Sequence, residues 1–467
     1  MADHTLISDA HGDADTFPTV TYADWRALVE GAGGGPTVDD LGRVDEDGLR
    51  VEPLYATEHV AGIDPGWPAF EPFTRGSTAL GVAISGWEVR QAHALDGRSV
   101  AEIRHSIRDD LEGGATALAL SGIAGTGALA EVLADVDLLV VPIYLEPASD
   151  GLASARALVE VWTARGLGSA DARGSFGLDP LGLAARDPHL AFHVEVALAD
   201  AAAFAVSSSA SWPGARDLVV DVRAYHDDGA TAGQCVAMAL ATGVAYLRAL
   251  EAAGLDVAAG AGRLRFAWSL DADVFGGAVM LRAARRAWAR VLQACGAPEA
   301  ARGMRNDVTT ARRMLAERDP ENNIVRGTLA TLGAVLGGAD AIVVRPYDLA
   351  VGAPASRARR IARTTQRVLM DEGQLNRVVD AAGGAFAVEA RTEALARAAW
   401  ARFQDIERAG GMVSAVERGL VTGWLAEAAA SRAERLADGR QVVVGVNRYR
   451  GDGPAVADER GAAGRQA

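Results

Sequence analysis

Two short segments of the chain carry residue types that could do chemistry. Tyr225 and His226 open the sequence Tyr-His-Asp-Asp-Gly-Ala, directly after an apolar run from Leu218 to Arg223 that reads as a strand. In a barrel of parallel strands, active-site residues lie where the strands end. A phenol and an imidazole there could donate hydrogen bonds to a substrate carbonyl. The pair could equally be bonded to loop backbone, and spacing alone leaves both interpretations open.

The second segment runs from Asp319 to Arg326 and reads Asp-Pro-Glu-Asn-Asn-Ile-Val-Arg. It precedes an apolar helical run, so Asn322 is a plausible helix cap. Asp271 and Asp273 follow another predicted strand and could act as an acid and a base, but nothing in the sequence pairs them with a nucleophile. We therefore expect them to be solvated loop acids.

Three further groups have weaker patterns. Gly122 to Gly127 follows a strand and opens a helix, as a phosphate-binding turn does, but its order is not the dinucleotide fingerprint, and a plain turn is the alternative. The serines from 207 to 209 lack a Gly-x-Ser-x-Gly context and read as a loop. With only two cysteines, Cys235 and Cys295, we expect buried free thiols rather than a disulfide or zinc site.

The elements that must position these residues alternate between apolar strands and amphipathic helices, which favours a parallel sheet. The predicted strands are Leu80 to Ile84, Ala115 to Leu120, Asp137 to Tyr144, a run around Ser175, Leu218 to Arg223, Leu264 to Trp268, Asp340 to Arg345, and Ala385 to Glu389. The predicted helices cover 98–113, 126–135, 150–165, 229–253, 276–294, 324–335 and 355–371. Eight such units predict an α/β fold with a closed (β/α)8 barrel of the TIM type, which takes about 250 residues or more.

The 467 residues therefore suit one barrel with flanking segments. We expect an extended N-terminal segment over 1–75 that wraps a surface, the barrel over 76–390, a helical tail and linker over 391–449, and a disordered end over 450–467. Within the tail, Gly410-Gly411 marks a break, and Val442 to Val446 is a further strand-like run.

Composition excludes several classes of protein. The chain is 49% hydrophobic and 23% charged, as globular proteins are. A net charge of −15 argues against non-specific binding to nucleic acid or to an anionic membrane. We find no signal peptide and no uninterrupted apolar run near about 18 residues, and so expect a cytoplasmic protein without a membrane span.

Several segments, in this order, resemble the methylmalonyl-CoA mutase family over nearly the whole chain. They are Asp47 to Tyr55, Phe73-Thr74-Arg75-Gly76, Gly86 to Gln91, Tyr225-His226-x-x-Gly229-Ala230, Glu321 to Arg326, and Val444 to Tyr449. The resemblance implies a barrel whose axis the pantetheine of an acyl-CoA threads. It also implies a following flavodoxin-like domain that binds adenosylcobalamin through a histidine in an Asp-x-His-x-x-Gly motif, and a radical interconversion of methylmalonyl-CoA and succinyl-CoA.

The chain departs from the family's catalytic pattern in three places. Ala92 stands where catalytic chains carry a tyrosine over the substrate, and Gly177 stands where they carry a substrate-contacting glutamine. The Asp-x-His-x-x-Gly motif is absent, and about 18 residues follow Tyr449, whereas a flavodoxin-like domain needs on the order of 100 or more. We therefore expect no cofactor or metal on this chain alone, with adenosylcobalamin bound by a partner chain.

Two phrases, Asp110 to Thr116 and Ser175 to Ala184, are most similar to the small subunit of the heterodimeric bacterial enzymes. The leading hypothesis is thus a non-catalytic small subunit that stabilises a catalytic large subunit, with Tyr225 and His226 vestigial. The alternative is the substrate-binding barrel of a split mutase whose cobalamin domain is a separate chain, with the pair contacting an acyl-CoA. A neighbouring gene for a full-length mutase would favour the first, and a gene for a lone cobalamin-binding protein the second.

Overall fold

Eight parallel strands close into a barrel with helices around it. The computed structural model describes residues 20–31, 35, 37–95, 97–123, 125–191 and 193–450. The strand order is β10-β3-β4-β5-β6-β7-β8-β9, and every neighbouring pair is parallel. The strands are β3 (Glu88–Ala94), β4 (Ala117–Ser121), β5 (Ile143–Leu145), β6 (Gly174–Leu178), β7 (Ala215–Asp221), β8 (Leu264–Leu270), β9 (Asn306–Thr310) and β10 (Ala341–Val343). This confirms the predicted fold class.

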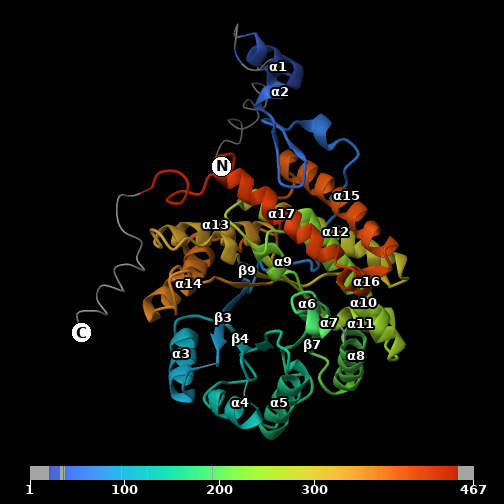
Figure 1. Ribbon diagram of the computed structural model, residues 1–467, viewed down its shortest axis with the longest axis vertical. Coiled ribbons are helices and arrows are strands. Elements are labelled where there is room, and N and C mark those ends of the chain that lie inside the picture. The colour runs from blue at the N-terminus through green and yellow to red at the C-terminus, as the bar shows by residue number, and fades with distance from the viewer. Residues whose placement is uncertain are drawn as a thin grey trace, which may run out of the picture.

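Helices follow the strands and form the outer layer (Figure 1). They are α3 (Val100–Glu112), α4 (Thr126–Val132), α5 (Gly151–Ala164), α6 (Pro180–Ala184), α7 (Pro188–Ala191), α8 (Val194–Ser211), α9 (Arg223–Asp227), α10 (Ala232–Ala252), α11 (Val257–Gly262), α12 (Val274–Ala294), α13 (Asn322–Leu336) and α14 (Ser356–Arg367), with short turns η5 (Glu299–Ala301), η6 (Arg312–Met314) and η7 (Val368–Glu372). Capping boxes begin α3 at Ser99 and α10 at Thr231, which fixes where these helices start.

Four predicted strands are wrong. Leu80 to Ile84 forms turns that leave both of these side chains exposed, and Ala385 to Glu389 is mostly the start of α15 (Phe386–Arg408). Of Asp137 to Tyr144, only the end belongs to β5, and Val442 to Val446 has no ladder beyond one isolated bridge. In these runs, apolar residues cover loops or surfaces instead of entering the sheet, which a short apolar pattern cannot distinguish.

Two barrel strands, β3 and β9, escaped prediction because they are not apolar runs. β3 reads Glu-Val-Arg-Gln-Ala-His-Ala and β9 reads Asn-Asp-Val-Thr-Thr, yet nearly all of these residues are buried or half-buried. Their inward positions carry charged side chains that pair with one another inside the barrel. A prediction from hydropathy therefore does not assign strands to these two segments.

The N-terminal segment has two parts. Helix α1 (Tyr22–Glu30) buries no residue and stands clear of the body together with α2 (Val38–Leu41), as Figure 1 shows. After the small hairpin β1 (Arg43–Val44) and β2 (Arg50–Val51) and the turn η4 (Thr57–Val60), the chain passes beneath the barrel into β3. There Arg285 of α12 donates to the carbonyls of Phe73 and Thr74, which anchors the segment to the barrel.

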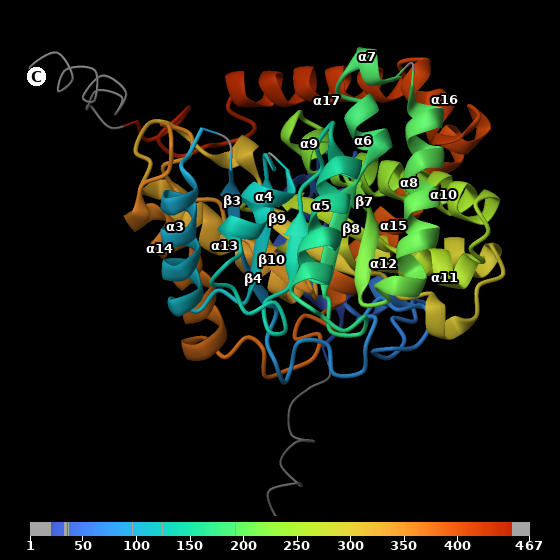
Figure 2. The ribbon, with the colours of Figure 1, turned by 90° about the horizontal axis from the view of Figure 1, so that it is seen from below.

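The C-terminal helices cover two sides of the barrel. Helix α15 packs against α10 and α12, and α16 (Gly411–Glu417) and α17 (Leu420–Ala437) follow it. In Figure 2, α17 lies across the barrel end where α6 and α9 follow their strands. Gly410 has a positive φ of 106° at the break between α15 and α16, as glycine allows. The segment boundaries given above stay predictions, and residues 1–19 and 451–467 lie outside the described part of the chain.

Two smaller expectations were also wrong. The serines from 207 to 209 lie in α8 and not in a loop. Cys235 is buried as expected, but Cys295 is exposed at the end of α12. Helices α8 and α10 are long and apolar enough to cross a membrane by length and composition, although most of α10 is buried in the core.

Candidate site at the barrel axis and its mouth

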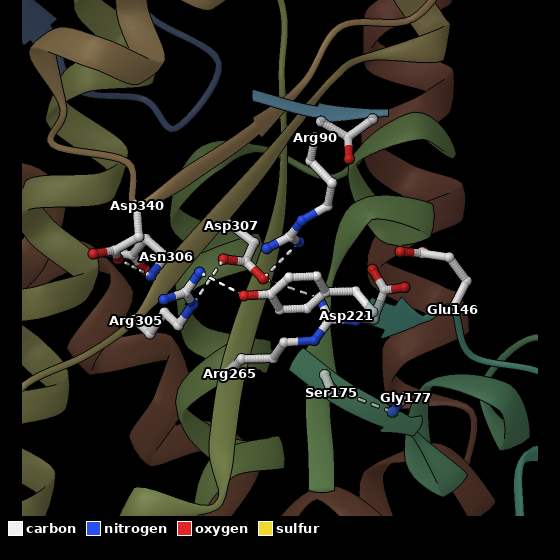
Figure 3. Close-up of polar contacts among 12 residues, drawn as sticks. Arg90, Glu146, Ser175, Gly177, Asp221, Arg265, Arg305, Asn306, Asp307 and Asp340 are labelled. Atoms are coloured by element: carbon white, nitrogen blue, oxygen red, sulfur yellow. Dashed lines mark hydrogen bonds and ion pairs between the residues drawn. The ribbon is translucent and has the colours of Figure 1, made fainter. Parts of the chain in front are cut away.

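Buried charges fill the inside of the barrel. Asp307 on β9 lies 2.9 Å from Arg90 on β3, 3.2 Å from Arg265 on β8 and 3.3 Å from Arg305. Figure 3 shows its carboxylate between the three guanidinium groups. Burial alone would raise the pKa of Asp307, but the three positive charges outweigh burial and hold that pKa well below its usual range. We call these four residues the barrel ion cluster.

Tyr144 on β5 extends the barrel ion cluster across the axis. The Arg90 guanidinium carbon lies 3.4 Å from the centre of the Tyr144 ring, a cation–π contact. The Tyr144 hydroxyl donates to Glu88 and accepts from Arg305, both at 3.0 Å. Burial raises the pKa of Tyr144 to about 12, so the phenol stays neutral. Side chains from four strands thus meet where an axial channel would run.

The mouth of the barrel lacks the two side chains that the family pattern predicts. Ala92 lies two residues beyond Arg90 on the same face of β3 and is exposed. Gly177 on β6 has φ of +71°, and a Cβ atom there would lie 2.3 Å from the Leu145 carbonyl oxygen. No side chain fits this position while the backbone stays as it is. A glutamine could not be restored at position 177 by substitution alone.

A second group of charges lies higher in the mouth. Arg223 bonds both Asp221, at 2.6 Å, and Glu146, at 2.5 Å. Burial would raise the pKa of Asp221, but Arg223 outweighs it and lowers that pKa to about 2. Nearby Asp179 accepts hydrogen bonds from the Tyr246 hydroxyl and the Gly182 amide. Burial, together with the charge of Asp221, raises the pKa of Asp179 to about 7.

Tyr225 and His226 lie together on α9 but face different surroundings. The Tyr225 hydroxyl is buried on the side of Asp179 and has no hydrogen-bond partner among the described residues. Burial and then Asp179 raise the pKa of Tyr225. His226 faces Asp271 and Asp227, each 3.9 Å from a ring nitrogen. Burial and then Arg313 lower the pKa of His226, so its imidazole is held neutral.

The loop after α9 is shaped by α17. Gly229 has φ of +119°, and a Cβ atom there would lie 2.9 Å from the Cα of Ala429. Arg313 donates to the carbonyls of His226 and Ala230 and lies 2.9 Å from Asp271. This loop is therefore tied from both sides, and α17 fixes its shape.

The other candidate residues have structural roles. Asp271 pairs with Arg313 and is not a free solvated acid, whereas Asp273 is exposed and accepts from the Gly276 amide as the cap of α12. Asn322 does not cap α13: Glu321 takes that position without a side-chain bond. Asn323 instead bonds Ala316 and Tyr347, joining two loops. In the segment from Gly122 to Gly127, Gly122 and Gly125 have positive φ, as a turn requires.

Sequence reasoning missed Asp307, Arg265 and Arg305 altogether. The signal was present as charged residues at alternate positions, such as Glu88 and Arg90, bounded by apolar ones. When charged and apolar residues alternate, the charged face of the strand is predicted to be exposed to solvent unless the barrel is already known.

The two buried histidines of the barrel, His226 and His93, do not suit the role of cobalt ligand to the cobalamin that the fold family implies. His226 is 5% exposed and its surroundings disfavour a charge, and His93 lies 3.2 Å from Asp110 within a pair shared with Arg359. In the described part of the chain, no group of three or more His, Cys, Asp or Glu side chains could hold a metal ion. No chemical step on this chain is derived through that cofactor.

The fold and the mouth define a TIM-type barrel protein whose axis is filled with ion pairs. Residues 121–460 match the family model described as methylmalonyl-CoA mutase, so the chain belongs to the methylmalonyl-CoA mutase family.

Three relatives carry small-subunit names. The chain is 41% identical over 95% of its length to a methylmalonyl-CoA mutase small subunit of Streptomyces virginiae, and 34% identical over 93% to that of Propionibacterium freudenreichii subsp. shermanii. It is 36% identical over 86% to a probable small subunit of Mycobacterium tuberculosis. The alignments cover 73%, 69% and 65% of these relatives' own lengths, so the chain spans about two thirds of such proteins.

Proposed function

We propose that this chain is the non-catalytic small subunit of an adenosylcobalamin-dependent methylmalonyl-CoA mutase, and that it stabilises a catalytic large subunit. The observation that carries the proposal is the barrel ion cluster. In this family the acyl-CoA is expected to thread the barrel axis. Here Arg90, Tyr144 and Asp307 occupy that axis in mutual contact.

Opening the axis would be costly. Displacing Asp307 would remove the carboxylate that three buried arginines share, and breaking a buried ion pair costs several kcal/mol. The mouth adds two further obstacles, because Ala92 supplies no phenol and Gly177 admits no side chain. In this proposal the cofactor and the substrate belong to the partner, and this barrel serves as a rigid support.

The N-terminal segment supports the proposal that this chain binds a large subunit. Helix α1 has no buried residue, and its apolar side chains include Leu28, which is 77% exposed. An isolated amphipathic helix of this length is marginal in water unless it packs on another surface. Stable obligate interfaces bury on the order of 2,000 Å² or more, and this segment extends the surface available for one.

A direct test is to co-express the chain with a full-length mutase large subunit. We expect a stable complex, with mutase activity that depends on the large subunit and a large subunit that is more stable in the complex. Isothermal titration of the isolated chain with methylmalonyl-CoA should give no heat of binding. Stoichiometric binding of the acyl-CoA by this chain would contradict the proposal.

A second candidate function is the substrate barrel of a split mutase. One observation favours it: the Tyr225 hydroxyl and the His226 Nδ1 are buried near the mouth and have no hydrogen-bond partner among the described residues. The acyl-CoA titration separates the two functions, since only a substrate barrel binds the thioester.

A further inference from the structure

A large cleft opens next to the barrel mouth: His226, Asp271 and Arg313 line it, and no residue of the barrel ion cluster does. Its volume is about 1060 Å³, at the upper end of the roughly 300–1,000 Å³ typical of small-molecule sites. It is bordered by the hairpin β1–β2, the starts of α12, α13 and α15, the helix α17 and the segment 440–444. Figure 1 places these helices beside the N-terminal segment.

Apolar side chains form much of the lining and are open to solvent. Phe275 at the start of α12 is 55% exposed, and Val325 on α13 is 60% exposed. Val44 and Val444 face the same cleft from the hairpin and the C-terminal segment, and both are exposed. These four residues come from four separate parts of the chain. Their exposure in one concave place marks a binding site.

The charges of the lining are unbalanced. Eight arginines and six carboxylates line the cleft, in a chain whose net charge is −15. Four of the carboxylates already have a cationic partner: they are Glu46, Glu52, Asp47 and Asp271, paired with Arg435, Arg50, Arg402 and Arg313.

Several of the arginines, by contrast, have no carboxylate partner. The side chains of Arg391 on α15 and of Arg43 have no hydrogen bond or ion pair with any described residue. Arg326 bonds the Val444 carbonyl and the Asn323 side-chain oxygen, both uncharged.

Arg432 of α17 is a further arginine of the cleft whose hydrogen-bonding capacity is largely unused. It reaches only the Arg313 carbonyl, at 3.5 Å, and its Nε is buried without a partner among the described residues. Burial lowers the pKa of Arg432 and of Arg326, so both guanidinium groups would be stabilised by an added anion. A guanidinium group binds carboxylate or phosphate through two parallel hydrogen bonds.

We propose that this cleft is a binding site for a small amphipathic anion, an apolar chain or ring that ends in a carboxylate or phosphate. The apolar part lies against Phe275 and Val325, and the anionic end meets Arg326, Arg391 and Arg432. Although His226 lines it too, this site contains no residue of the barrel ion cluster, on which the proposed function rests. Failure of this proposal would therefore leave that function standing.

The test titrates the full chain with decanoate, decyl phosphate and uncharged decanol, each below its micelle or solubility limit, by isothermal calorimetry. We expect saturable 1:1 binding of at least one of the two anions and at least tenfold weaker binding of decanol. The two anions distinguish a carboxylate site from a phosphate site. Arg391→Gln should weaken binding of the better anion about tenfold, because it removes a charged hydrogen-bond donor from the site.

Matched variants keep the result decisive. Arg391 has no partner to lose, so Arg391→Gln should fold normally, and Val325→Glu places a negative charge on an exposed helix position and should abolish anion binding. Arg357→Gln on α14, an exposed arginine outside the cleft, should change nothing. Absence of saturable binding, equal binding of decanol, or equal effects of Arg391→Gln and Arg357→Gln would each overturn the proposal.

Discussion

Asp307 is the carboxylate that three arginines inside the barrel share. Asp307→Ala should leave Arg265 buried without an ion pair and leave Arg90 and Arg305 to share Glu88 alone. We expect a loss of about 3–5 kcal/mol in the free energy of unfolding. Urea denaturation measures this. The control is Asp371→Ala, which removes an exposed pair with Arg367 and should cost less than about 1 kcal/mol. Equal losses in the two variants would show that the barrel ion cluster is not a main source of stability.

Asp179 is a carboxyl group whose pKa is raised by folding, so its protonated form stabilises the folded state. Its pKa in the folded chain is about 7, above the unfolded value of about 3.9, so the folded state holds a proton that the unfolded state has lost. The stability that this proton provides is present below about pH 4 and is lost as the pH rises through about 7. Asp179→Asn keeps an oxygen for Tyr246 and Gly182 but carries no charge.

We therefore expect Asp179→Asn to gain stability relative to the parent as the pH rises from 4 to 8, by on the order of 1–3 kcal/mol. Thermal or urea unfolding at several pH values measures it. A constant difference across that range would show that Asp179 does not titrate near neutrality.

At the scale of elements, helix α1 has a local signal for its start, because Thr21 and Asp24 form a capping box. No residue of α1 is buried against the rest of the chain. Removing residues 1–31 should leave the thermal midpoint of the barrel within a few degrees and weaken binding to a large subunit at least tenfold. Pull-down and calorimetry measure both. Undiminished affinity for the large subunit would argue against the wrapping role of this segment. As a control, Arg357→Gln changes an exposed side chain outside the segment and should leave the affinity unchanged.

At the scale of the whole molecule, one repaired side chain should not make this barrel an enzyme. Ala92→Tyr adds a phenol at an exposed position, but the axis stays filled by Arg90 and Tyr144, and Gly177 still admits no side chain. Groups that act as a unit are not additive. We expect no mutase turnover from this variant, alone or with an added cobalamin-binding protein. Robust turnover would replace the proposed function with the split-enzyme alternative.

The sequence by itself determined the class of fold and the family. Alternating apolar strands and helices predicted the barrel, and ordered motifs such as Tyr225-His226-x-x-Gly229-Ala230 predicted the relationship. Local signals suffice for the fold class, because most strands buried on both faces are apolar and capping residues mark where helices begin. The roles of Ala92 and Gly177 as departures were also readable from the chain alone.

Only the tertiary structure decided what fills the barrel. Glu88, Arg90 and Asp307 read as surface residues, since a charged side chain is rarely buried unless it is paired. The partners come together from separate strands, and Arg90 and Asp307 lie 217 residues apart in the chain. The same holds for the cleft, whose arginines are ordinary along the sequence. Their lack of carboxylate partners exists only once α13, α15 and α17 are brought to one place.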